Sequence, residues 1–148
     1  MKAHTHVLVA TDFSGPNEAA IHRAADLARQ CGARLTLLHV IEHVPFDAPL
    51  ISTASAQVED QPILRMQLER AEAAMRRLVE RLGLEDAAVE ILPSMHSARR
   101  TLLDWAQAHG VDLIVVAPHG RGLVDALGST AVGVVTHARC DVMVVRGG

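Results

Sequence analysis

Residues that could bind a phosphate or a sugar lie in two glycine-containing segments far apart in the sequence. The first, Val9–Gly15 ("VATDFSG"), ends an apolar run and carries Thr11 and Asp12. The second, Ala117–Thr130 ("APHGRGLVDALGST"), follows another apolar run and ends in Gly-Ser-Thr. A carboxylate can accept hydrogen bonds from ribose hydroxyls, and the free N–H groups of a helix N-terminus attract phosphate. The two segments together predict a site for a phosphorylated sugar.

The same residues also have a purely structural interpretation. Asp12 can order the turn that follows it through bonds to the backbone. Gly128 can simply form a turn and Ser129 can cap the helix that follows. Alternatively, Gly128 permits close approach of a ligand, and the hydroxyls of Ser129 and Thr130 donate to its phosphate. The residue types alone leave both interpretations open.

Two further polar residues, His119 and Arg121, lie inside the second segment. His119 is a candidate for a ligand contact, whereas Arg121 is either solvated or paired with a phosphate. Hydrolysis of ATP or of a small ester would need a base that positions water, and only His119 or Asp12 is available for that role. The sequence contains neither a Walker-A pattern nor a Gly-x-Ser-x-Gly nucleophile motif. We therefore expect that the protein is not an enzyme.

The elements that would position these residues follow from the apolar pattern. Short runs rich in Val, Ile and Leu are typical of strands buried on both faces of a parallel sheet. They are His6–Thr11, Arg34–Val40, Ala88–Leu92, Asp112–Ala117 and Asp141–Arg146. The segments between them have helical spacing, and glycines follow three of these helices. With right-handed crossovers, this alternation predicts an α/β fold: a three-layer, open, parallel five-stranded sheet in the order 3-2-1-4-5, with helices on both faces.

This strand order brings the two glycine-containing segments together. Ligands of open α/β sheets bind beyond the carboxyl ends of the strands, at the point where the strand order reverses. In the order 3-2-1-4-5 that point lies between the first and fourth strands. Those are the strands that the segments starting at Val9 and Ala117 follow, so both should border one crevice.

Composition excludes several classes of function. The 148 residues suit a single domain spanning residues 1–148, and 49% of them are apolar. A net charge of −3 and only 2% aromatic residues argue against binding to nucleic acid. No signal peptide or membrane span is apparent, and the two cysteines suit reduced thiols, so we expect a cytoplasmic protein. The long connection from Ile41 to Asp60 is expected to be functional or mobile.

The sequence resembles the universal stress protein family over nearly its whole length. The resemblance rests on the segments "HVLVATDFSGPNEAAIHRAADLA", "LTLLHVIE", "LLDWAQAHGVDLIVVAPHGRG" and "LGSTAVGVVTHARCDVMVVR". It implies the same sheet order and a homodimer in which the fifth strands, here Asp141–Arg146, pair antiparallel. Such pairing would cover an otherwise open sheet edge.

The family pattern for ATP binding is Gly-x-x-Gly, nine residues, then Gly-Ser or Gly-Thr. On this chain the pattern falls on Ala117, Gly120 and the pair Gly128-Ser129, so alanine replaces the first glycine and only seven residues follow Gly120 before the pair. The resemblance also places the backbone of Val40 against the base. It implies a regulatory homodimer with an adenine-nucleotide site for ATP or AMP, with Mg²⁺ as a further component. The alternative is a nucleotide-free dimeric interaction module that acts through an unknown protein partner.

Overall fold

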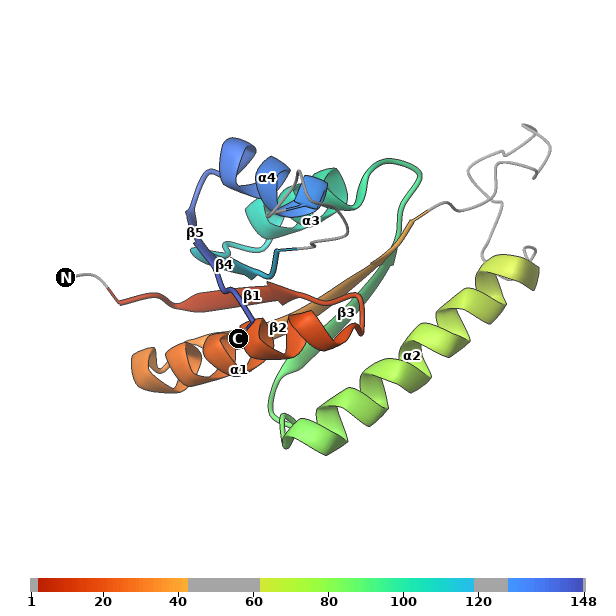
Figure 1. The fold of residues 1–148 in the computed structure, drawn as a ribbon, viewed down its shortest axis with the longest axis horizontal. Coiled ribbons are helices and arrows are strands. Elements are labelled where there is room, and N and C mark those ends of the chain that lie inside the picture. Colours follow the sequence, from red (N-terminus) through yellow and green to blue (C-terminus); the bar gives the residue numbers. More distant parts are fainter. Residues whose placement is uncertain (1–2, 43–61, 119–127, 148) are drawn as a thin grey trace.

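The computed structural model describes residues 3–42, 62–118 and 128–147, with only the backbone of Ser129 (Figure 1). The strands of the described part are β1 (His6–Ala10), β2 (Arg34–Ile41), β3 (Ala88–Pro93), β4 (Leu113–Val116) and β5 (Asp141–Val144). The helices are α1 (Gly15–Cys31), α2 (Pro62–Leu82), α3 (Ala98–Ala108) and α4 (Gly128–His137). Strands and helices alternate along the chain, as the apolar pattern predicted.

The strands form one parallel sheet in the order β3-β2-β1-β4-β5, which confirms the predicted topology. Three strands are shorter than expected, because β1 ends at Ala10, β4 spans only Leu113–Val116 and β5 ends at Val144. The hydrogen bonding nevertheless continues one residue further on β1 and β5. The amide of Thr11 donates to the carbonyl of Leu38 at 2.9 Å, and the amide of Val145 donates to the carbonyl of Val116 at 2.9 Å.

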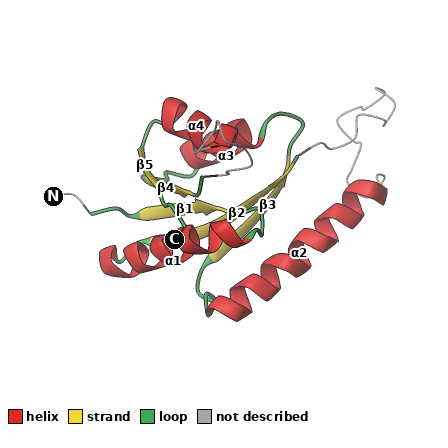
Figure 2. Ribbon diagram, viewed as in Figure 1, coloured by secondary structure: helices red, strands yellow, loops and turns green. Residues whose placement is uncertain are grey.

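Helices cover both faces of the sheet. Figures 1 and 2 show α1 and α2 on one side of the strands and α3 and α4 on the other. Successive side chains of β1 pack on opposite faces of the sheet. Val7 and Val9 pack in the core beneath α1, whereas Leu8 packs in the core beneath α3 and α4. All three side chains are fully buried. β1 therefore contributes side chains to both cores and lies at the centre of the sheet.

The first helix lies close to the sheet because its buried face carries small residues. Ala20, Ala24 and Ala28 on this face are at most 4% exposed. The helix ends at Gly32, whose φ of 64° is the left-handed conformation that closes many helices. Among the residues that the structure describes, none of the helices combines the length and the apolar character that crossing a membrane requires.

Candidate functional site

A cavity with a volume of about 160 Å³ lies at the predicted point of strand reversal, and we call it the switch-point cavity. The ends of β1, β2 and β4 and the starts of α1, α3 and α4 border it. Of the residues that the sequence nominated, Thr11, Asp12, Val40, Ala117 and Thr130 line this cavity. Segments that are more than 100 residues apart in the chain therefore meet here, as the strand order required.

The remaining nominated residues are placed differently. Gly128 is the first residue of α4, is buried, and has a φ of 74°. This left-handed conformation favours glycine, so Gly128 does form the turn into α4 that its structural interpretation requires. Ser129 is the second residue of α4, so the expectation that it caps this helix is wrong, and its side chain is outside the described part. His119 and Gly120, together with Arg121, also lie outside the described residues.

Side chains hold the turn between β1 and α1 in a defined conformation. One carboxylate oxygen of Asp12 accepts a hydrogen bond from the amide of Ser14 at 2.9 Å, and the Thr11 hydroxyl oxygen accepts one from the amide of Phe13 at 3.0 Å. The amide of Asp12 donates to the side-chain oxygen of Asn17 at 2.6 Å. Asp12 thus orders the turn, as its structural interpretation predicted, and it borders the cavity from this fixed position.

The centre of this turn is strained. Phe13 has a φ of 65°, which is uncommon for a bulky residue and costs about 1–3 kcal/mol. Its ring lies against that of His39, with the ring centroids 4.4 Å apart. The Nδ1–H group of His39 donates to the carbonyl of Thr11 at 2.7 Å. His39 on β2 therefore supports the turn after β1 from the neighbouring strand, and such strain is characteristic of functional turns.

The sequence did not nominate several residues that the structure places at the cavity. They are Asn17, His39, Glu42, Ala98, Leu102 and Ala131. Asn17 is 6% exposed, although it lies in the first turn of a helix that begins at the surface. A polar residue in that position is a signal that sequence reading could have used. The two residues that α3 places at the cavity, Ala98 and Leu102, carry no such signal, because they fit the ordinary apolar face of a helix.

A separate polar cluster lies at the amino end of the sheet, around His6 on β1. His6 is 4% exposed, its Nε2 atom lies 2.8 Å from the Thr36 hydroxyl, and its Nδ1 atom lies 3.2 Å from the carbonyl oxygen of His109. A neutral ring satisfies both contacts when Nδ1 carries the proton. Burial lowers the pKa of His6, and the nearby Arg34 guanidinium lowers it further, against the opposing effect of the His109 carbonyl.

Asp112, just before β4, ties the start of β1 to this cluster. Its carboxylate accepts hydrogen bonds from the Thr5 amide at 2.8 Å, the Thr5 hydroxyl at 3.0 Å and the His6 amide at 3.0 Å. Partial burial by itself would raise the pKa of Asp112, but these hydrogen bonds outweigh it and hold the pKa below its usual range. Because its contacts are internal, the cluster has a structural role.

The fold and the cavity together define a class of protein. An open parallel sheet in the order 3-2-1-4-5, with a cavity at the reversal point between a carboxylate and a helix N-terminus, is the architecture of a doubly wound α/β domain, a class in which the reversal point is the usual place of ligand binding.

Within this class, the sequence profile of the Universal stress protein family matches residues 4–146, and the chain belongs to that family. Universal stress protein A homolog 2 of Coxiella burnetii is 35% identical over 130 residues, which are 85% of this chain and 83% of that protein. The structure of universal stress protein UspA from Lactobacillus plantarum has a TM-score of 0.80 and 28% identity, covering 99% of this chain and 100% of that one. A universal stress protein in complex with cAMP has a TM-score of 0.63 and 25% identity, covering 98% of both chains.

Proposed function

We propose that the protein is a regulatory homodimer that binds an adenine nucleotide, ATP or AMP, in the switch-point cavity. The observation that carries this proposal is the convergence of Thr11, Asp12, Val40, Ala117 and Thr130 on that one cavity. The complex of a related universal stress protein with cAMP supports the same class of ligand. Binding in this proposal regulates the protein and is not followed by turnover.

Each part of the nucleotide has a candidate partner. The exposed carboxylate of Asp12 would accept hydrogen bonds from the ribose, and the backbone of Val40 would lie against the base. Thr130, with Gly128 and Ser129, would hold the phosphate at the start of α4, where the helix dipole favours an anion. Mg²⁺ is a further component of the proposal when ATP is the ligand.

The size of the cavity refines the proposal. About 160 Å³ is below the roughly 300–1,000 Å³ of typical small-molecule sites, and it suits a base or a sugar better than a whole nucleotide. The phosphate-binding pattern of the family falls in part on residues 119–127, which lie outside the described residues. The described cavity is therefore proposed to hold the nucleoside, with the phosphates toward the start of α4.

A matched pair of threonine variants on α4 tests the proposal. Thr130→Val removes a hydroxyl at the cavity and keeps the shape of the side chain, whereas Thr136→Val removes an exposed hydroxyl that donates to the Val132 carbonyl on the same helix. We expect Thr130→Val to weaken binding of Mg-ATP and of AMP about tenfold, the effect of one lost charge-assisted hydrogen bond. Thr136→Val should leave binding unchanged. Isothermal titration calorimetry with nucleotide-free protein measures both.

The proposal fails if the wild-type protein gives no heat with either nucleotide and releases none on denaturation. It also fails if the two threonine variants weaken binding equally, because the phosphate would then lie elsewhere.

The homodimer is proposed to form through Asp141–Arg146. β5 is an edge strand of the sheet, and its described neighbour is β4. The amide of Val145 points toward β4, where it donates to Val116, so the amide of Val144 points to the open edge.

We expect Val144→Pro to convert a dimer to a monomer, because proline removes that outward N–H. Val144→Ala keeps the N–H and should remain dimeric. Light scattering coupled to size-exclusion chromatography gives both masses, and a dimer that persists in Val144→Pro would contradict this interface.

A nucleotide-free interaction module remains the second candidate, and two observations favour it. The cavity is small, and the Asp12 carboxylate already has a structural role in its own turn. In that case a protein partner captured by the full chain should be retained equally well with and without Mg-ATP. Loss of the partner on removal of ATP would contradict this alternative.

A further inference from the structure

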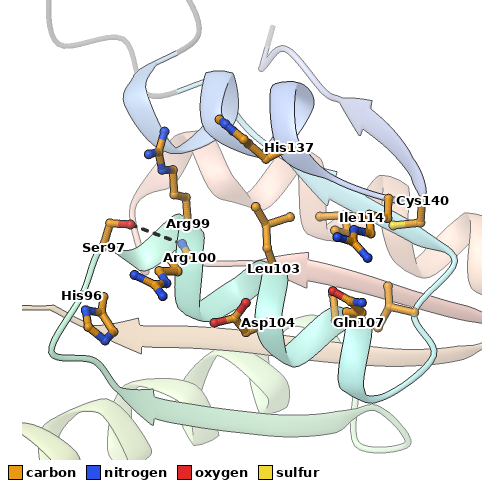
Figure 3. A pocket seen from close by; sticks show the side chains of 13 residues that line it. His96, Ser97, Arg99, Arg100, Leu103, Asp104, Gln107, Ile114, His137 and Cys140 are labelled. Carbon is orange, nitrogen blue, oxygen red and sulfur yellow. Dashed lines mark hydrogen bonds between the residues drawn. The ribbon is translucent and has the colours of Figure 1, made fainter.

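A second and larger cavity, of about 700 Å³, lies between α3 and α4, and we call it the α3–α4 groove (Figure 3). None of its lining residues lines the switch-point cavity. Its volume is within the range of sites that hold small molecules. Nothing in the proposed nucleotide site uses it.

The side chains at the rim of the groove are mainly cationic. Arg99 and Arg100 come from the first turn of α3, and Arg139 follows α4. His96 and His137 also line it, and Asp104 is the acidic residue of the lining. The chain as a whole has a net charge of −3, so this concentration of guanidinium groups reverses the overall sign locally. Such a surface attracts anions.

Two of the three arginines of the groove, Arg99 and Arg100, lie at the start of α3, whereas Arg139 directly precedes Cys140. Figure 3 shows His96, Ser97, Arg99 and Arg100 together where α3 begins, and Cys140 and Gln107 at the other end. The Ser97 hydroxyl oxygen accepts a hydrogen bond from the Arg100 amide at 3.3 Å, which caps the helix. The start of the helix adds its dipole to the two guanidinium groups, and this combination suits a compact anion such as phosphate.

The interior of the groove is apolar. Ala106, Val111 and Ile114 line it and are at most 7% exposed, and Leu103 is partly buried beside them. Figure 3 shows Leu103 in the middle of the groove, between the cationic end and Cys140. Burial raises the pKa of the Cys140 thiol, with smaller contributions from Asp141 and Asp112, so the thiol is uncharged at neutral pH, and the adjacent Arg139 is the cation at this end. The groove therefore offers an end with two arginines and an apolar body.

Gly133 on α4 sets the position of Arg99. A Cβ atom at residue 133 would overlap the Cδ atom of Arg99, so the stem of this arginine packs directly on the helix backbone. The carbonyl of the same residue accepts a hydrogen bond from Nδ1–H of His137 at 3.0 Å, a bond that needs only the backbone. The absence of a side chain at Gly133 therefore makes room for Arg99.

We propose that the α3–α4 groove binds a small organic phosphate whose phosphate group lies at the start of α3 and whose apolar body lies over Leu103 and Ile114. Two planar guanidinium groups can form paired hydrogen bonds with phosphate oxygens. The two arginines and the helix N-terminus at the start of α3 fit a single anionic head. An acidic peptide that also reached Arg139 is an alternative outcome that the test below includes.

Titration of the full-length protein, labelled with ¹⁵N, tests the proposal with three probes: hexyl phosphate, inorganic phosphate and hexanol. We expect hexyl phosphate to shift groove amides and to bind more tightly than either other probe, because only it supplies both parts. Arg99→Gln combined with Arg100→Gln should weaken its binding at least about tenfold. The matched control, Arg70→Gln combined with Arg77→Gln on the exposed face of α2, should not change it.

Gly133→Ala supplies a variant that leaves every charge in place. Alanine favours the helix over glycine, so we expect the fold to be retained while the Arg99 stem is displaced and binding of hexyl phosphate falls. Equal binding by wild type and the arginine double variant would overturn the proposal. So would groove amides that shift on dilution of the protein or on addition of poly-glutamate but not with hexyl phosphate, because the groove would then be a protein interface.

Discussion

The folded structure favours the neutral form of the His6 imidazole. Its ring is buried at the amino end of β1, between the Thr36 hydroxyl and the His109 carbonyl, with the Arg34 guanidinium 3.3 Å from Nδ1. A second proton on the ring would have no acceptor at Thr36 unless the hydroxyl rotated, and it would meet the guanidinium charge. Burial is the largest cause of the lowered pKa.

This arrangement predicts a dependence of stability on pH. Because the folded-state pKa of His6 lies below the ordinary value of 6.5, the unfolded chain takes up the proton more readily. The contribution of His6 is therefore complete above pH about 6.5 and is lost as the pH falls toward the folded-state pKa. We expect His6→Gln to be less stable than wild type at pH 7.5 and to lose less of its stability on going to pH 5.5. Urea unfolding at both pH values measures the difference, and parallel slopes for the two proteins would contradict it.

Residue identity allowed part of the site to be predicted. Asp12 and Thr130 could be nominated because a carboxylate after a strand and a hydroxyl at a helix start have known chemistry. The positive φ of Phe13 and the support from His39 could not be predicted, since they depend on a contact between β2 and the turn that follows β1. Ala98 and Leu102 are typical core residues until the fold places them at a cavity.

Among the elements, the helix ends were the most predictable from sequence. Gly32, Gly83 and Gly110 all have φ between 64° and 68°, in agreement with the glycines expected to follow the first three helices. The strand ends were less predictable. Thr11 and Val145 each donate a backbone hydrogen bond to the neighbouring strand from one residue beyond the end of their own strand, although one side chain is polar and the other is apolar.

Two glycines at the ends of α1 allow the effect of backbone conformation on stability to be measured separately from the effect of packing. A Cβ atom added to either Gly32 or Gly15 would have no neighbouring atom within 4 Å, but only Gly32 has a positive φ. We expect Gly32→Ala to lower the free energy of unfolding by about 1 kcal/mol, the cost of a left-handed alanine. Gly15→Ala should change it by less than about 0.5 kcal/mol. Urea denaturation of both variants measures this, and equal losses would mean that the positive φ of Gly32 is not responsible.

At the scale of the whole molecule, the sheet order was predictable because right-handed crossovers leave few arrangements. The α3–α4 groove was not, although it is the larger cavity. Arg99 and Arg100 come from α3 and Arg139 comes from the segment after α4, and no sequence spacing relates them. Only the packing of α3 against α4 places all three along one groove.

The central position of β1 predicts the order in which the molecule opens. Val7, Leu8 and Val9 are fully buried, and strands pair with β1 on both sides. We expect the amides of these residues to exchange with solvent only through global unfolding, with an opening free energy equal to that from urea denaturation. The amides of β3, the edge strand at the opposite side of the sheet from β5, should open at lower cost. Native-state hydrogen exchange followed by NMR measures both, and faster exchange in β1 than in β3 would contradict this order.

Helix α3 lies between the switch-point cavity and the α3–α4 groove. Ala98 and Leu102 border the switch-point cavity, and the residues that directly follow them, Arg99 and Leu103, border the groove on the other side. Any displacement of this one helix alters both volumes at once. If filling one compartment changes affinity in the other, thermodynamic reciprocity requires the same factor in the reverse direction. In that case, binding constants for the cavity or for the groove are comparable only when the occupancy of the other site is held fixed.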